Sequence, residues 1–224
     1  NCLVINAVND GYPEQKFNSQ VKRIGGESKP KGSTALYDLT DVYGYNNNGE
    51  QNAISYKRGF FLTDNRYSLI VQDELELAKP NSTFHSFFHV TENGVITINP
   101  DGKSGTIEKG GEILDFTVIC DADEWKLEKW DAVYIDPSMD RNLLTDDPDK
   151  MEYDRSDISK IAIVGRDSGK LNISVKMSVR DKGREYSEHT FVPMESWQIP
   201  DGELPRYPVL DKVFVNGISY DEFS

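Results

Sequence analysis

Short segments rich in Val, Ile, Thr, Phe and Tyr recur along the chain and predict β-strands. The clearest runs over 171–179, where every second residue is apolar. This period of two places one face of a strand in a core and the other face in water. Segments of similar character lie at 67–71, 83–90, 95–98, 112–119, 158–164 and 212–215. No stretch carries a long helical period, so the pattern favours an all-β protein.

Turn-forming residues separate these segments at short intervals and supply the positive φ that tight hairpins need. They are Asp10-Gly11, Asn46 to Gly49, Asn93-Gly94, Asp101-Gly102, Gly110-Gly111, Asp201-Gly202 and Asn216-Gly217. Many short strands between closely spaced turns predict a single antiparallel two-sheet β-sandwich, supersandwich-like, over residues 1–224. We interpret residues 136–157 as a long acidic surface loop, and residues 193–208 as an extended crossing before the last hairpin.

Composition narrows the choice of partners. The 224 residues carry a formal net charge of −13, which would repel nucleic acid and anionic membranes. No apolar run approaches the roughly 20 residues that a membrane span needs. We therefore expect neither nucleic acid nor membrane as a partner. Cys2 and Cys120 each lie in an apolar run and resemble small buried hydrophobes, although a disulfide between them stays open.

The sequence contains no strong metal or nucleotide motif. His85 and His89 lie four residues apart on one predicted strand and therefore point to the same face. They could form a ligand-binding or metal-binding face, or be two polar residues on the solvent side with Phe84 and Phe88 in the core. We favour the second interpretation, because the sequence places no third ligand. The aspartates of the acidic loop do not have calcium-loop spacing. We expect no cofactor, and leave a divalent metal such as zinc or calcium open.

The most informative part of the chain runs from residue 35 to residue 75. It predicts an aspartate-capped turn, then two long antiparallel strands joined through residues 63–66. It brings Tyr43, Tyr45, Tyr56, Lys57 and Arg58 close together along the chain. A tyrosinate can remove a proton, a tyrosine can protonate a leaving oxygen, and a cation can hold a carboxylate, which is what elimination on a uronic acid requires. Alternatively, these are tyrosines at favoured sheet positions beside ordinary surface cations.

This ordered series resembles the β-sandwich region of heparinase II/III-like polysaccharide lyases. The motifs are Asp38-Leu39-Thr40-x-x-Tyr43, Tyr56-Lys57-Arg58-x-x-x-Leu62, and Leu69-Ile70-Val71-x-Asp73-Glu74. Further similarity lies in Asn1-x-x-Val4-Ile5, in Asp10-Gly11 with Gln15, and in Phe87-Phe88-His89. The resemblance covers residues 1–98 and is diffuse afterwards. No single motif is strongly specific, so the order of the motifs carries it.

The resemblance implies a bacterial, periplasmic or secreted lyase that cleaves a uronic-acid polysaccharide, heparin-like or alginate-like, by β-elimination. It implies that this chain is the C-terminal part of a larger enzyme and is inactive alone. An N-terminal (α/α) toroid would line the other side of the cleft, and would supply the carboxylate-neutralising Asn and one catalytic Tyr. The acidic polysaccharide and that toroid are the implied partners.

Site roles follow from the same resemblance. By motif, Tyr43 is the catalytic residue, and substrate-binding residues are Arg58, Lys57, Tyr45 and His89. Zinc-bearing relatives carry a His beside the Arg of the second motif, where this chain has Lys57, which argues against zinc.

The alternative hypothesis is a carbohydrate-binding or structural β-sandwich without chemistry. It predicts exposed aromatic rings, for instance Trp125, Trp130 and Trp197, aligned as a stacking platform. The same tryptophans could instead pack in the core or between domains.

Overall fold

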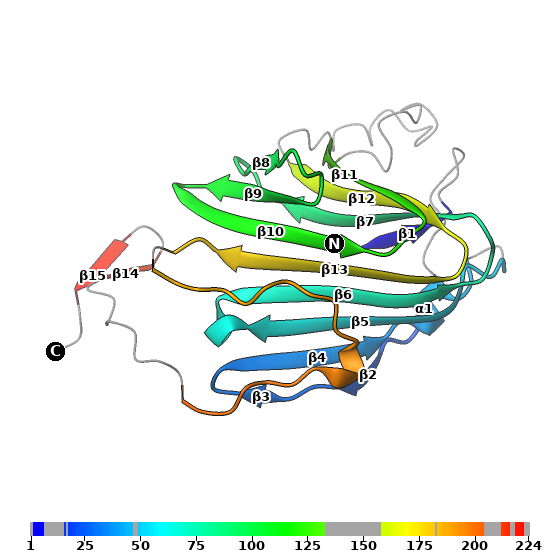
Figure 1. The fold of residues 1–224 in the computed structure, drawn as a ribbon, viewed down its shortest axis with the longest axis horizontal. Coiled ribbons are helices and arrows are strands. Elements are labelled where there is room, and N and C mark those ends of the chain that lie inside the picture. Colours follow the sequence, from blue (N-terminus) through cyan, green and yellow to red (C-terminus); the bar gives the residue numbers. More distant parts are fainter. Residues whose placement is uncertain are drawn as a thin grey trace.

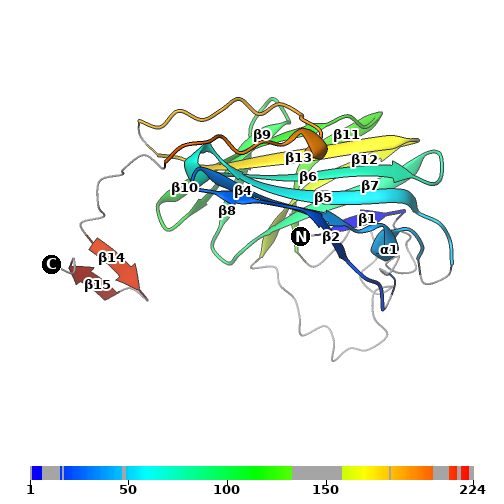
Figure 2. The same cartoon turned by 90° about the horizontal axis from the view of Figure 1, so that it is seen from below.

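The computed structural model describes residues 2–6, 16, 18–46, 49–132, 158–181, 183–203, 212–215 and 218–221. It confirms the all-β prediction, because two antiparallel sheets make up most of this part of the chain. Figure 1 looks onto the sheets, and Figure 2 shows the same strands after a turn of 90°. None of the helices among these residues is long and apolar enough to span a bilayer.

The smaller sheet has four strands. In spatial order they are β1 (Leu3–Ile5), β7 (Ser82–Val90), β12 (Ser159–Asp167) and β11 (Glu124–Asp131). The β7–β12 pairing runs without interruption from Ser82 opposite Asp167 to Val90 opposite Ser159. The long central pair therefore anchors the sheet, and the three-residue strand β1 adds to its edge at β7.

The larger sheet holds the remaining long strands. In spatial order they are β2 (Lys22–Gly25), β4 (Gly32–Asp38), β5 (Ala53–Thr63), β6 (Ser68–Leu77), β13 (Lys170–Val179), β10 (Glu112–Cys120), β9 (Ser104–Lys109) and β8 (Val95–Ile98), and β3 (Ser28–Lys29) also pairs with β4. The short helices are α1 (Thr40–Tyr43), η1 (Asp64–Arg66) and η4 (Met194–Ser196). A separate hairpin joins β14 (Lys212–Val215) to β15 (Ile218–Asp221). The predicted link between two long strands at 63–66 is confirmed as η1 between β5 and β6.

The main core lies between the two sheets and follows the alternation of apolar residues. Strand β13 contributes Leu171, Ile173 and Val175, all fully buried, which confirms the predicted apolar face at these positions. The predicted solvent face is wrong for Ser174 and Lys176, which are buried. Phe84 and Phe88 of β7 also enter this core, as predicted. Burial of large apolar side chains on facing sheets is the main stabilising contribution to such a sandwich.

A second apolar cluster lies on the outer face of the smaller sheet. It contains Phe87, Trp130, Ala162 and Val164, and the ammonium of Lys160 lies 4.1 Å from the centre of the Phe87 ring. Strand β12 is therefore buried on both faces, which explains its continuous apolar run over 161–164. Burial lowers the pKa of Lys160 to about 8.

The three tryptophans lie in three different places. Trp125 packs against the main core and Trp130 belongs to the outer cluster. Trp197 packs its ring on Phe61, with the ring centres 5.2 Å apart. They do not form one stacking platform. Cys2 and Cys120 both carry free thiols, and burial raises the pKa of Cys120 to about 12.

Residues 183–203, which we call the strap, cross the outer face of the larger sheet (Figure 1). The side-chain amide of Gln72 donates to the Val192 carbonyl at 2.8 Å, and the Met194 amide donates to the Glu74 carboxylate at 2.7 Å. The predicted extended crossing at 193–208 is thus observed as far as residue 203. The predicted acidic loop at 136–157 lies outside the described residues.

Buried polar contacts hold the N-terminal half of the strap. Lys176 forms an ion pair with Asp64 at 2.7 Å and donates to the Ser187 carbonyl at 2.6 Å. His189 lies between two hydroxyl groups, with Nδ1 2.7 Å from Thr117 Oγ1 and Nε2 3.0 Å from Ser174 Oγ. A neutral imidazole offers one donor and one acceptor, which suits two hydroxyl groups.

The β12–β13 hairpin offers a matched pair of glycines that tests the packing. A methyl group on Gly165 would meet the Glu124 carbonyl oxygen and lie 2.7 Å from Phe84 Cζ, whereas Gly169 has open space. We expect Gly165→Ala to lower the free energy of unfolding by about 1–3 kcal/mol. Gly169→Ala should change it by less than about 0.5 kcal/mol. Urea denaturation measures both, and equal effects would contradict this account of the core.

Mild acid should lower the stability of the fold through His189 of the strap. Burial, aided by the charge of Lys176, lowers the pKa of His189 to about 4 from its usual 6.5. Between these two values the unfolded chain binds a proton that the folded chain does not, so the free energy of unfolding falls as the pH falls from 6.5 to 4. Comparing His189→Gln with the parent by urea denaturation at pH 7 and pH 4.5 isolates this contribution, which we expect to be about 1–2 kcal/mol. An identical pH dependence in both proteins would exclude it.

Candidate functional site

The candidate site is built where β4 ends and the chain turns through α1. The Asp38 carboxylate accepts a hydrogen bond from the Thr40 amide at 2.9 Å, which confirms the predicted aspartate-capped turn. The Thr40 hydroxyl in turn accepts from the Tyr56 amide of β5 at 3.0 Å. These two bonds attach the turn to the larger sheet, and the side chains that follow are therefore placed rigidly.

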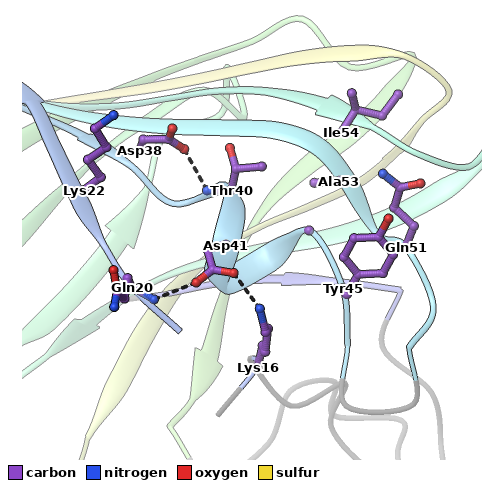
Figure 3. Close-up of a pocket in the computed structure, with 11 residues that line it drawn as sticks. Lys16, Gln20, Lys22, Asp38, Thr40, Asp41, Tyr45, Gln51, Ala53 and Ile54 are labelled. Atoms are coloured by element: carbon purple, nitrogen blue, oxygen red, sulfur yellow. Dashed lines mark hydrogen bonds and ion pairs between the residues drawn. The ribbon is translucent and has the colours of Figure 1, made fainter. Parts of the chain in front are cut away.

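An open pocket of about 550 Å³ lies beside this turn (Figure 3). Its volume is within the usual range for small-molecule sites. Its lining comes from three separate stretches of chain. These residues are Lys16, Gln20, Lys22, Asp38, Thr40, Asp41, Gly44, Tyr45, Gln51, Ala53 and Ile54. Most of these residues have polar side chains, and Tyr45 and Ile54 contribute the large apolar surfaces of the pocket.

The pocket contains two carboxylates that stay ionised at neutral pH. A hydrogen bond from the Lys16 ammonium at 2.6 Å and another from the backbone amide of Gln20 at 2.8 Å lower the pKa of Asp41 (Figure 3). Hydrogen bonds from Thr40 lower the pKa of Asp38. Lys22 lies opposite Asp38 in the β2–β4 pairing. The lining thus contains two lysines and two aspartates, and Lys57, opposite Asp38 in the β4–β5 pairing, adds a further cation beside it.

A buried polar cluster lies on the inner face of the larger sheet, beneath the same turn. Arg58 binds Asp73 through two parallel hydrogen bonds, Nε to Oδ1 at 2.6 Å and Nη2 to Oδ2 at 2.7 Å. The Tyr56 hydroxyl donates to the same carboxylate at 3.0 Å. The Asp73 side chain is 2% exposed and that of Arg58 12%. Burial acts to lower the pKa of Arg58, but the charge and hydrogen bonds of Asp73, together with Tyr56 and Tyr43, raise it, so the guanidinium keeps its charge.

Tyr43 packs against this cluster from the end of α1. Its ring meets the Tyr56 ring edge-on, with the ring centres 4.8 Å apart. Burial raises the pKa of Tyr43 to about 12, although nearby Arg58 and a hydrogen bond with the Leu3 backbone act in the opposite direction. The phenol is therefore protonated at neutral pH, and its side chain is only partly buried. Such a group can donate a proton but is a poor base.

The structure brings together two of the five residues that the sequence suggested for a site. Tyr43 and Arg58 share the buried cluster, whereas Tyr45 lies in the pocket. Lys57 is exposed and faces away from Arg58, since the two are neighbours on β5. His89 is exposed on the outer face of the smaller sheet, on another side of the molecule.

The two histidines of β7 point to one face, as predicted, and their rings flank that of Phe87. Burial and a neighbouring positive charge lower the pKa of His89. Within the described ranges, no three side chains of His, Cys, Asp or Glu gather in a way that could hold a metal ion.

Sequence reasoning missed the polar lining of the pocket and the central position of Asp73. Lys16, Gln20 and Asp41 come together only through the fold, and nothing in their spacing suggests it. Asp73 had a usable signal, because an aspartate inside an apolar strand pattern must find a partner when it is buried.

Comparison with known proteins adds no assignment: no protein-family model matches the chain, and no curated protein matches its sequence.

The buried ion pair can be tested against an exposed one in the same protein. Asp73→Ala leaves Arg58 and the Tyr56 hydroxyl buried without their acceptor, so we expect the free energy of unfolding to fall by about 3–5 kcal/mol. Asp115 pairs with Arg180 while the two side chains are 42% and 51% exposed, so Asp115→Ala should cost less than about 1 kcal/mol. Urea denaturation measures both variants. The double variant Arg58→Met, Asp73→Leu should recover much of the loss, and failure to do so would contradict this interpretation of the cluster.

Proposed function

We propose that this chain is the β-sandwich wall of a polysaccharide lyase that cleaves a uronic-acid-containing polysaccharide by β-elimination. It would act beside a helical toroid, which would line the opposite side of the cleft. We further propose that the enzyme is bacterial and works in the periplasm or outside the cell. The resemblance of residues 1–98 to heparinase II/III-like lyases motivates this proposal, and the side-chain geometry around Tyr43 supports it.

The observation that carries the proposal is the environment of Tyr43. The motif tyrosine is partly buried, lies against a second tyrosine, and has a permanent cation nearby. Its pKa of about 12 suits a proton donor to the leaving glycosidic oxygen. The base that removes the proton from the sugar would then come from the toroid. The structure thus narrows the role proposed for Tyr43 to that of the acid, whereas the residue type alone allowed it to be either the base or the acid.

Arg58 acts differently from what its residue type suggested. Two of its N–H groups are committed to Asp73, so we assign it an electrostatic role and not direct capture of the substrate carboxylate. A fixed positive charge close to Tyr43 would favour the developing phenolate as the proton leaves. Asp73 is then a positioning residue that holds Arg58 in place.

A second candidate is saccharide binding without chemistry. The observation that favours it is Tyr45, which is 51% exposed at a pocket that also has polar side chains in its lining. Partly exposed aromatic rings beside polar side chains are suited to stacking on sugars. This candidate needs neither Tyr43 nor Arg58.

Removing one hydroxyl group separates the two candidates. In the protein that joins this sandwich to its toroid, Tyr43→Phe should lower kcat by about 100-fold or more on a uronic-acid polymer. Binding of the polymer should stay within about threefold, because the ring packing is kept. Turnover is followed by the ultraviolet absorbance of the unsaturated product.

Tyr186→Phe is the matched control, since it removes a tyrosine hydroxyl of the strap that donates to the Val179 carbonyl of β13, away from the site. It should leave turnover unchanged. Full activity in Tyr43→Phe, or absence of activity on every polyuronate, would refute the lyase proposal.

A further inference from the structure

The pocket beside α1 differs chemically from a site for an acidic sugar. A uronate or sulfate needs an uncompensated cation, and charge-assisted bonds to Arg or Lys are its usual means of recognition. Here Lys16 is held by Asp41 at 2.6 Å, and Lys22 lies opposite Asp38, where its charge helps to lower the pKa of that carboxyl group. Both carboxylates are ionised, so an incoming carboxylate would meet two fixed negative charges beside these lysines.

The same lining suits hydroxyl groups. An ionised carboxylate accepts hydrogen bonds from hydroxyls, and side-chain amides such as those of Gln20 and Gln51 both donate and accept. Gln51 and Tyr45 lie side by side in Figure 3, because their backbones form a β-bridge. Vicinal hydroxyls of a pyranose ring offer the matching donors and acceptors.

An apolar surface completes the lining. Tyr45 and Ile54 are each 51% exposed, so both present apolar area to solvent at the pocket. The Tyr45 backbone is fixed before any ligand binds, because the Asn46 amide bonds to the Glu50 carbonyl and the Asn52 amide to the Gly44 carbonyl, both at 2.9 Å. Pre-formed aromatic surface binds with little loss of conformational entropy. The C–H face of a sugar ring is the natural occupant of such a surface.

We infer that this pocket binds an uncharged sugar ring, one that carries neither carboxylate nor sulfate. Binding of that ring is independent of any reaction, and only its role as a lyase subsite rests on the proposed function. If the pocket binds a neutral sugar and the chain is part of a lyase, the substrate is a heteropolysaccharide in which uronic acids alternate with neutral sugars. A homopolymer of uronic acid, such as alginate, would fit the pocket poorly.

The test compares neutral and acidic oligosaccharides on the same protein. Cellohexaose, mannohexaose and xylohexaose are the neutral probes, and hexamers of mannuronate and galacturonate are the acidic ones. Isothermal titration calorimetry at 50 and 200 mM NaCl gives the affinities. At least one neutral hexamer should bind with an affinity insensitive to salt, and the uronate hexamers should bind at least about tenfold more weakly.

Four variants locate the binding. Tyr45→Ala should lower the affinity for the neutral probe by about tenfold. Tyr45→Phe keeps the ring, so its affinity should stay within about threefold of that of the parent. Asp41→Asn removes a negative charge and releases Lys16, so it should weaken the neutral probe and strengthen the uronate probes. Val95→Ala changes a 55% exposed residue of β8 outside the pocket lining, and should have no effect.

Each remaining outcome overturns the inference. Absence of binding by all three neutral hexamers would do so, as would unchanged binding in Tyr45→Ala with its fold intact by circular dichroism. Tighter, salt-sensitive binding of the uronate hexamers would show an anionic site instead. The lyase proposal is judged separately by Tyr43→Phe, so either proposal can fail while the other stands.

Discussion

Burial of the two facing sheet surfaces is the constraint on which this molecule depends. Strand side chains alternate between faces, so a slip of one residue in the pairing would move an entire set of apolar side chains into water. The pairing of β5 with β6 has an additional device against such a slip. Arg58 lies opposite Asp73 in that register, and the two hydrogen bonds between them require this alignment. A buried ion pair contributes little net stability, and we assign this one a role in specifying register.

The strap makes the outer face of the larger sheet part of the interior. That face would otherwise present polar side chains such as Gln72, Ser174 and Lys176 to solvent. Instead Gln72 and Lys176 bond to strap carbonyls, and Ser174 bonds to His189. The polar residues of β6 and β13 therefore serve as attachment points, and the sheet is covered on both sides along much of its length.

The turn at α1 separates two chemical environments with a single helical turn. Thr40 and Asp41 face an open pocket, while Val42 is buried and Tyr43 packs against the buried Tyr56. The pocket has balanced charges and an exposed ring, which is suited to recognition. The cluster around Tyr43 is largely buried, and in the proposed lyase a proton donor and a fixed cation would have their largest effect there. Under both proposals, recognition and chemistry would be adjacent without sharing any side chain.

The sequence by itself determined the class of fold and much of its detail. The apolar positions of β13, the hydrogen bond of Asp38 at the turn and several predicted turns depend on local geometry and appear in the structure as predicted. Those turns have positive φ at Asn93, Gly102, Gly110, Gly111 and Gly202. Those features rest on contacts between residues near one another in the chain. The grouping of site residues is a different matter. Lys57 and Arg58 are adjacent in sequence, yet the pleat sends one to solvent and the other into the core. Lys16, Gln20 and Asp41 meet only because β2, α1 and the preceding segment pack together, and the pKa of Tyr43 depends on burial by residues far away in the chain. Spacing along a chain reports which face a side chain takes, whereas charge balance and solvent access are set by packing, and only the tertiary structure decided them.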